Sequence, residues 1–174
     1  MGILVLLLTA CLTAAEPFQA SGTASVGQAR LTVVAAFATW DADNQHLRVM
    51  LLPFKPSEEQ LGWVRKQPAH DYQVVESPAR PFVRLDLRLK PEATGPFHPD
   101  QLRHYDLSVW RVSGENGVVS TQGNKIAGTL KVAGDFRQGR PITLEANGTH
   151  KQMDGTVVRW DFKARCGVFA IPSL

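Results

Sequence analysis

The sequence predicts an all-β fold, mainly an antiparallel sandwich or a barrel-like sheet, with one short helix. Two segments, residues 83–90 and 158–166, alternate apolar with mostly charged side chains. Because side chains alternate faces along a strand, each segment predicts a strand with one buried and one solvated face, which is typical of antiparallel sheets. Turn signals separate further strand-like segments every ~8–12 residues, and this spacing favours a sandwich or barrel.

The remaining strands are predicted from apolar segments that end in turn residues. Asp41, Asp43 and Asn44 supply a polar turn after a long apolar segment, and Asn116-Gly117 is a hairpin signal because both central residues of such a turn need positive φ. The expected strand segments are residues 28–40, 46–53, 107–112, 118–122, 126–132 and 141–148.

A single helix is expected over residues 57–66. Ser57 and Gln60 have the spacing of a capping box, acidic residues occupy the first turn, and basic residues occupy the last. Pro68 prevents the helix from continuing. We expect this helix to cover one edge or end of the sheet. Two proline-rich stretches are expected to be loops, residues 67–81 and 91–105.

The N-terminus predicts export and a lipid anchor. An apolar run at residues 3–8 leads into Leu-Thr-Ala-Cys at residues 8–11, which resembles the lipobox of bacterial lipoproteins. In that motif the cysteine, here Cys11, receives diacylglycerol and becomes the mature N-terminus. The run is too short to span a bilayer, which needs ~20 apolar residues. We therefore expect membrane attachment through the lipid on Cys11, at the periplasm-facing surface of the bacterial cell envelope.

Two alternatives remain open for this segment. Residues 13–15 offer an ordinary signal-peptidase site, which would make the protein secreted. The run could also be an apolar first strand of a cytosolic domain, and the lack of Lys or Arg before it weakens the signal-peptide interpretation. The expected organisation is a signal peptide at residues 1–15, or 1–10 if cleavage precedes Cys11, a tether at 16–21 and a single β domain at 22–174.

Composition and charge exclude some classes of function. Apolar content of 44% and charged content of 20% are ordinary for a globular domain. The net charge of +3 is spread along the chain without a basic stripe interleaved with aromatic residues, so no nucleic-acid partner is expected. Cys166 lies at an inward position of its strand and has no disulfide partner if Cys11 is acylated or removed. It is expected to be a small core residue rather than a catalytic thiol.

No constellation in the sequence identifies a reaction, and no catalytic residue, metal ligand or cofactor is assigned. His98, Asp100 and His104 form the densest group of potential ligands, but they lack the helical i, i+4 spacing of a zinc site. His70-Asp71 could orient a catalytic triad, yet no nucleophile elbow accompanies it. The turn at residues 41–44 lacks the later ligands of a calcium loop.

Tryptophans are the candidate ligand-binding residues. Trp110 lies on the same strand face as Ser108 and is a candidate for stacking on a ligand such as a sugar. Trp63 lies beside the apolar face of the predicted helix and is the second candidate. Trp160 is in the inward register of its strand and is expected in the core.

Both ends of the mature chain resemble small exported bacterial β-domains of uncharacterised function. Residues 22–32 are similar to their opening hairpin, and residues 126–130, Gly148 and residues 158–171 are similar to their closing meander. The resemblance implies an exported β-sandwich and no particular activity. We therefore expect a domain that binds or scaffolds. The alternatives are a small envelope hydrolase that uses the loop from His98 to His104, or a chaperone or inhibitor that pairs through a sheet edge.

Overall fold

The computed structural model describes residues 18–76, 80–110, 117–122 and 127–172, and it confirms the all-β prediction. The strands are β1 (Phe18–Val26), β2 (Ala29–Val33), β3 (Ala35–Asp41), β4 (His46–Leu52), β5 (Phe82–Leu89), β6 (Leu102–Trp110), β7 (Gly117–Gln122), β8 (Thr129–Ala133), β9 (Ile142–Lys151) and β10 (Val157–Ile171). The helical elements are α1 (Glu58–Lys66), η1 (Pro68–His70), α2 (Gln73–Glu76), η2 (Pro99–Gln101) and η3 (Phe136–Gln138).

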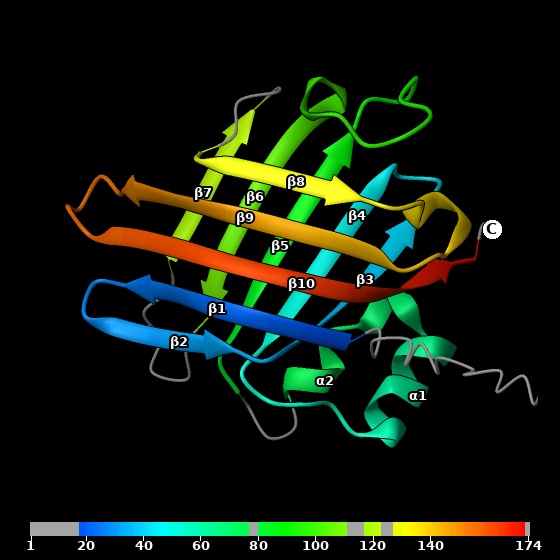
Figure 1. The fold of residues 1–174 in the computed structure, drawn as a ribbon, viewed down its shortest axis with the longest axis horizontal. Coiled ribbons are helices and arrows are strands. Elements are labelled where there is room, and N and C mark those ends of the chain that lie inside the picture. Colours follow the sequence, from blue (N-terminus) through cyan, green and yellow to red (C-terminus); the bar gives the residue numbers. More distant parts are fainter. Residues whose placement is uncertain (1–17, 77–79, 111–116, 123–126, 173–174) are drawn as a thin grey trace, which may run out of the picture.

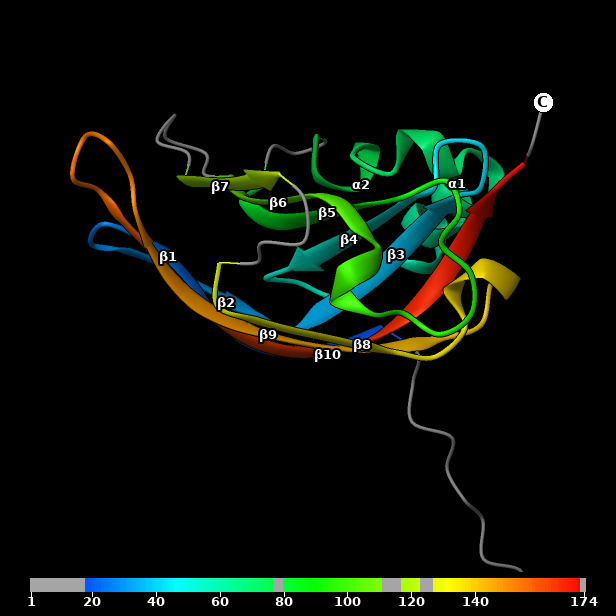
Figure 2. The ribbon, with the colours of Figure 1, turned by 90° about the horizontal axis from the view of Figure 1, so that it is seen from above.

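The strands form one curled sheet that folds back on itself at β10. We call the five strands in the order β2-β1-β10-β9-β8 sheet A, and the strands β3 to β7 sheet B. The end of β10 pairs in parallel with β3, Gly167 opposite Phe37, and thereby joins the two sheets. All other strand pairs in the described part of the chain are antiparallel. Sheet A crosses in front of sheet B, and α1 and α2 cover the far side of sheet B (Figures 1 and 2).

Two hydrophobic cores hold these three layers together. The larger core lies between the sheets. It is built from the side chains that point inward along each strand, such as Leu85 and Leu87 of β5 and Trp160 of β10. The smaller core lies between sheet B and the helices, where Phe37 and Met50 pack in one cluster with Val64 of α1. Sheet B is therefore buried on both faces where the helices cover it, which explains the long apolar runs of β3 and β4.

The helix at residues 57–66 forms as predicted. The Ser57 side chain accepts a hydrogen bond from the Gln60 N–H, and the Gln60 side chain accepts one from the Ser57 N–H, which completes the capping box. The helix packs on the face of sheet B with Leu61 and Val64 buried, and it covers one end of that sheet, where β3 begins and β4 ends. The expected loop at 67–81 also contains the short elements η1 and α2.

Several boundaries differ from the predicted ones for identifiable reasons. Residues 28–40 form two strands, because at Val34 the chain passes from sheet A to sheet B: the Val34 N–H donates to Leu52, and its carbonyl accepts from Ala20. β1 begins at Phe18, so residues 18–21 of the expected tether pair with β10. β6 begins at Leu102, within the expected loop at 91–105. The predicted turn before Gly117 and the lipobox lie outside the described residues.

Glycine is required where β1 packs against β10. Gly22 has φ of 125°, and a Cβ atom there would lie 2.1 Å from the carbonyl oxygen of Asp161 and 2.6 Å from the Cα of Phe162. Only a residue without a side chain permits this approach. The close contact keeps β1 in register with β10, and this register sets which polar side chains of sheet A face solvent together.

Candidate functional site

A charged network lies on the outer face of sheet B, and Asp86 of β5 is at its centre. The Asp86 side chain is held by three basic residues: His46 Nε2 lies 2.8 Å from Oδ1, Arg48 Nε donates to Oδ1 at 3.3 Å, and Arg84 Nε donates to Oδ2 at 2.7 Å. Asp86 is only 7% exposed. Charge-assisted hydrogen bonds therefore compensate a carboxylate that is almost removed from water.

A second carboxylate joins the helical layer to this network. Asp71 lies between η1 and α2, and its Oδ1 accepts a hydrogen bond from Arg48 Nη1 at 2.8 Å. Its Oδ2 accepts from the hydroxyl of Thr39 on β3 at 3.1 Å. Asp71 is 1% exposed. Arg48 thus bridges two carboxylates, and the helical layer is fastened to sheet B at this point.

Burial and charge shift the carboxyl pKa values in opposite directions. Burial raises the pKa of Asp71, because Arg48 and Thr39 offset it only in part. Burial also acts to raise the pKa of Asp86, but the hydrogen bond with His46 and the charges of Arg84 and Arg48 lower it below the ordinary value. Every carboxylate oxygen of the two residues is hydrogen-bonded. The arrangement is suited to anchoring the layers, because no oxygen is left without a partner.

A third carboxylate borders the network, and the charges of His104, Arg84 and Arg88 compensate its burial only in part. Asp106 of β6 is the cross-strand neighbour of Asp86, and its Oδ1 is buried without a hydrogen-bond partner. Burial and the nearby charge of Asp86 raise the pKa of Asp106. The network therefore ends at β6 on a carboxyl group whose pKa is above its ordinary value.

The stability of the fold is expected to depend on the ionisation of Asp86 at acid pH. The pKa of Asp86 is lowered on folding, so its ionised form stabilises the fold above the unfolded value of about 3.9, and this contribution is lost as the pH falls through the folded pKa. The advantage of the wild type over Asp86→Asn should therefore shrink on acidification below about pH 4. Urea titrations across this pH range measure it.

Asp71 provides the matched control, because the expected dependence of stability on pH has the opposite sign. Because folding raises the pKa of Asp71, protonation of this group adds stability as the pH falls, and the advantage of the wild type over Asp71→Asn should grow on acidification. Parallel pH profiles of the two variants would contradict the assigned directions.

The histidine candidates have different surroundings. His98 Nδ1 lies 3.2 Å from Asp100 Oδ2, and both side chains are largely exposed. His104 lies on strand β6 opposite Arg88, not in a loop. His70 Nδ1 lies 3.1 Å from Gln67 Oε1, while the neighbouring Asp71 bonds to Arg48 and Thr39, so His70 and Asp71 do not form the orienting pair of a triad. No group of three or more potential metal ligands is found among the described residues.

The two candidate tryptophans are exposed but differ in their surroundings. Trp110 is 37% exposed, and its ring stacks on Phe82 at a centroid distance of 5.8 Å, with the Arg84 guanidinium 5.9 Å from the ring centroid. Stacking on Phe82 reduces the ring surface of Trp110 that a ligand could reach. Trp63 is 40% exposed on α1, and within the described chain no ring contact joins it to Trp110.

The inward residues of β10 have the predicted burial. Trp160 is 2% exposed, and Cys166 is fully buried. Burial raises the pKa of the Cys166 thiol to about 12, so the reactive thiolate is suppressed at neutral pH.

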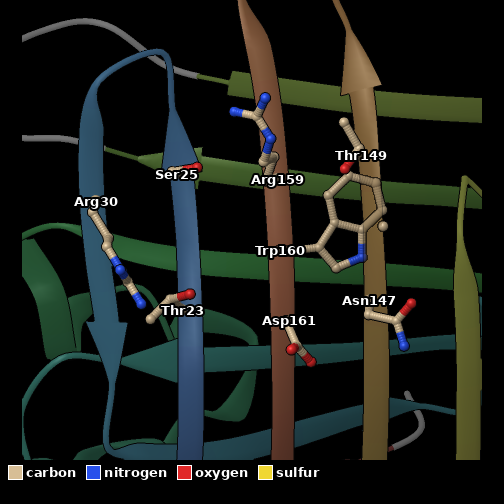
Figure 3. A pocket seen from close by; sticks show the side chains of 9 residues that line it. Thr23, Ser25, Arg30, Asn147, Thr149, Arg159, Trp160 and Asp161 are labelled. Atoms are coloured by element: carbon tan, nitrogen blue, oxygen red, sulfur yellow. The ribbon is translucent and has the colours of Figure 1, made fainter.

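The outer face of sheet A carries a polar pocket that the sequence did not reveal. It is an open depression of about 570 Å³, and its polar side chains come from β2, β1, β10 and β9 (Figure 3). The register places these side chains in two cross-strand rows. The first row consists of Arg30, Ser25, Arg159 and Thr149, and the second of Thr23, Asp161 and Asn147.

The rows arise from strand alternation. Residues of β1 and β10 that lie between the row members, such as Ala24 and Trp160, are buried in the core, so the row members face solvent. The sequence signal was present as polar residues at alternate positions, but only the strand register shows which of them adjoin. Asn147-Gly148-Thr149, which has the form of a glycosylation sequon, lines the pocket on β9, with one of its polar side chains in each row.

The chain matches none of the protein-family models, curated proteins or solved structures with which it was compared. Within the described residues, none of the helices has both the length and the apolar character needed to cross a membrane.

Proposed function

We propose that this chain is an exported, lipid-anchored β-domain that binds a ligand at the bacterial cell envelope. The observation that carries the binding function is the pocket on sheet A, where hydroxyl, amide, guanidinium and carboxylate groups from four strands face solvent together. Ligand sites are concave and contain a few convergent polar groups that orient the ligand. The hydrolase alternative, which uses the loop from His98 to His104, has weaker support, because the His98 and Asp100 side chains are largely exposed and His104 lies on β6 opposite Arg88.

The lipid anchor is supported by the lipobox and by its distance from the folded domain. Six residues lie between Cys11 and Phe18, where β1 begins, so the two are seven residue steps apart. An extended chain covers at most ~3.3–3.6 Å per residue, so an acylated Cys11 would hold the domain within roughly 25 Å of the membrane. At this distance the pocket can reach ligands at the membrane surface as well as soluble ones.

Acylation is tested by labelling cells with a palmitate analogue. The wild type should be labelled and the Cys11→Ala variant should not, since Cys11 is the proposed attachment site. Cys166→Ala is the matched control and should keep the label, because the Cys166 thiol is buried in the core. Equal labelling of the wild type and Cys11→Ala would exclude the anchor. A secreted wild type without label would also exclude the anchor, but it would not contradict the proposed ligand binding.

A further inference from the structure

We infer that the pocket on sheet A binds a phosphate ester that carries free hydroxyl groups, the chemistry of a glycerophosphate. The inference rests on the proposed binding function and names the ligand class for the same pocket. The two rows of the pocket differ in chemistry. The first row contains cations and hydroxyl groups, and the second contains groups that form hydrogen bonds with the hydroxyls of a ligand.

The first row is suited to the phosphate group. Arg30 on β2 and Arg159 on β10 lie on either side of Ser25, two strands apart, which corresponds to about 10 Å between their backbones. Thr149 continues the row on β9. Guanidinium groups offer several donors in a planar arrangement that matches phosphate oxygens, and hydroxyl groups add further donors. The two guanidinium groups point in opposite directions along their strands in Figure 3, so both side chains must turn toward Ser25 to contact a phosphate bound above it.

Both arginines are available for a ligand. Neither Arg30 nor Arg159 forms a side-chain hydrogen bond or ion pair in the described part of the chain, whereas Lys163 on the same face pairs with Glu145 at 3.2 Å. In Figure 3 the guanidinium of Arg30 lies beside Thr23, and that of Arg159 is directed away from Asp161. The cations are thus held on the pocket surface without an internal partner that a ligand would have to displace.

The second row is suited to the hydroxyl groups of the ester. Asp161 offers acceptors, Asn147 offers both donors and acceptors, and Thr23 offers a hydroxyl. The two rows are two residues apart along each strand, or about 7 Å. Because the Asp161 carboxylate repels a phosphate placed above it, the ligand should bind in one orientation, with its phosphate above the first row and its hydroxyls above the second.

The surrounding surface favours an anionic ligand. Besides the pocket arginines, the exposed outer face of sheet A carries four further basic residues and one further acidic residue, namely Lys131, Lys151, Lys163, Arg165 and Glu145. The excess of positive charge attracts anions and increases their local concentration, an effect that salt weakens.

Titrations of the full chain carrying Cys11→Ser test the inference, since this variant removes any contribution of the lipid. Glycerol 1-phosphate should shift the backbone amide resonances of Ser25, Asn147 and Arg159, and inorganic phosphate should bind more weakly because it lacks the hydroxyl contacts. The double variant Arg30→Gln/Arg159→Gln should weaken the binding of glycerol 1-phosphate at least tenfold. Asp161→Asn should bring the affinities for glycerol 1-phosphate and inorganic phosphate closer together.

The matched control is Lys131→Gln/Arg165→Gln, which removes the same charge from the same face but lies outside the pocket. It should keep most of the affinity. Equal loss in both double variants, or no binding of either phosphate ligand, would overturn the phosphate assignment. If glycerol shifts the pocket resonances while the phosphates do not, the pocket still binds a ligand, and only the phosphate assignment fails.

Vesicle flotation distinguishes the two sources of this chemistry. Binding to phosphatidylglycerol vesicles but not to phosphatidylcholine vesicles, lost in Arg30→Gln/Arg159→Gln, would identify a lipid headgroup as the source. Binding of glycerol 1-phosphate without vesicle binding would identify a soluble ester.

Discussion

Replacement of Asp86 by alanine is expected to lower the free energy of unfolding by about 3–5 kcal/mol, the usual cost of removing one partner from a buried ion pair. The variant leaves His46, Arg48 and Arg84 around an empty position, with side chains that are 11%, 23% and 32% exposed. Arg48 keeps Asp71 as a partner, but the other two lose the carboxylate they contact. Urea denaturation followed by circular dichroism measures the loss.

Two further variants separate charge from shape in this network. Asp86→Asn keeps an oxygen acceptor but removes the negative charge, so we expect a smaller loss than with alanine. Asp161→Ala removes an exposed carboxylate from sheet A and should change stability by no more than about 0.5 kcal/mol. If Asp86→Ala were as mild as Asp161→Ala, water would have to replace the carboxylate, and the network would not anchor the layers.

The features predicted from sequence are those specified by neighbouring residues. The strand over residues 83–90 follows from alternation alone, and the helix from the capping box of Ser57 and Gln60. Burial of Trp160 and Cys166 follows from the same alternation. These predictions succeed because side-chain direction in a strand and hydrogen bonding at a helix N-terminus depend on residues a few positions apart.

The candidate sites depend on contacts between distant residues and were therefore not predicted. Asp71 is 32 positions from Thr39 in the sequence, and its histidine neighbour suggested a catalytic role instead of an ion pair with Arg48. The pocket requires Arg30 and Arg159 to meet across β1, which follows from the register of three strands. Register is fixed by packing of the whole sheet, so alternation identifies outward residues without showing which are adjacent.

The parallel pairing at the end of β10 also could not be predicted from local sequence patterns. The apolar residues of β10 continue past Cys166 to Ile171, which predicts a long strand but not that its last five residues leave sheet A for β3. The aromatic pair of Phe18 and Phe169 stacks near this crossing, with centroids 6.0 Å apart. The position at which β10 passes from sheet A to sheet B depends on the packing of both hydrophobic cores.

Replacement of Trp160 by alanine is expected to cost about 3–5 kcal/mol, because it opens a cavity in the core beneath the pocket. The indole lies against Gly148 on β9: a Cβ atom at this glycine would be 2.3 Å from Cζ2 of Trp160 and 2.8 Å from the carbonyl oxygen of Ala127. Gly148→Ala should therefore overpack the site and cost about 1–3 kcal/mol. Chemical denaturation of each variant measures both losses.

The two substitutions should be strongly non-additive. In the Trp160→Ala background the added methyl group of Gly148→Ala no longer meets the indole, so most of its cost should disappear, leaving the part due to the Ala127 carbonyl. Gly62→Ala is the matched control, because a Cβ atom at this helical glycine meets nothing within 4 Å and should stabilise α1 by about 0.5–1 kcal/mol. An equal cost of Gly148→Ala in both backgrounds would mean that the Ala127 carbonyl, not the indole, excludes a side chain at this position.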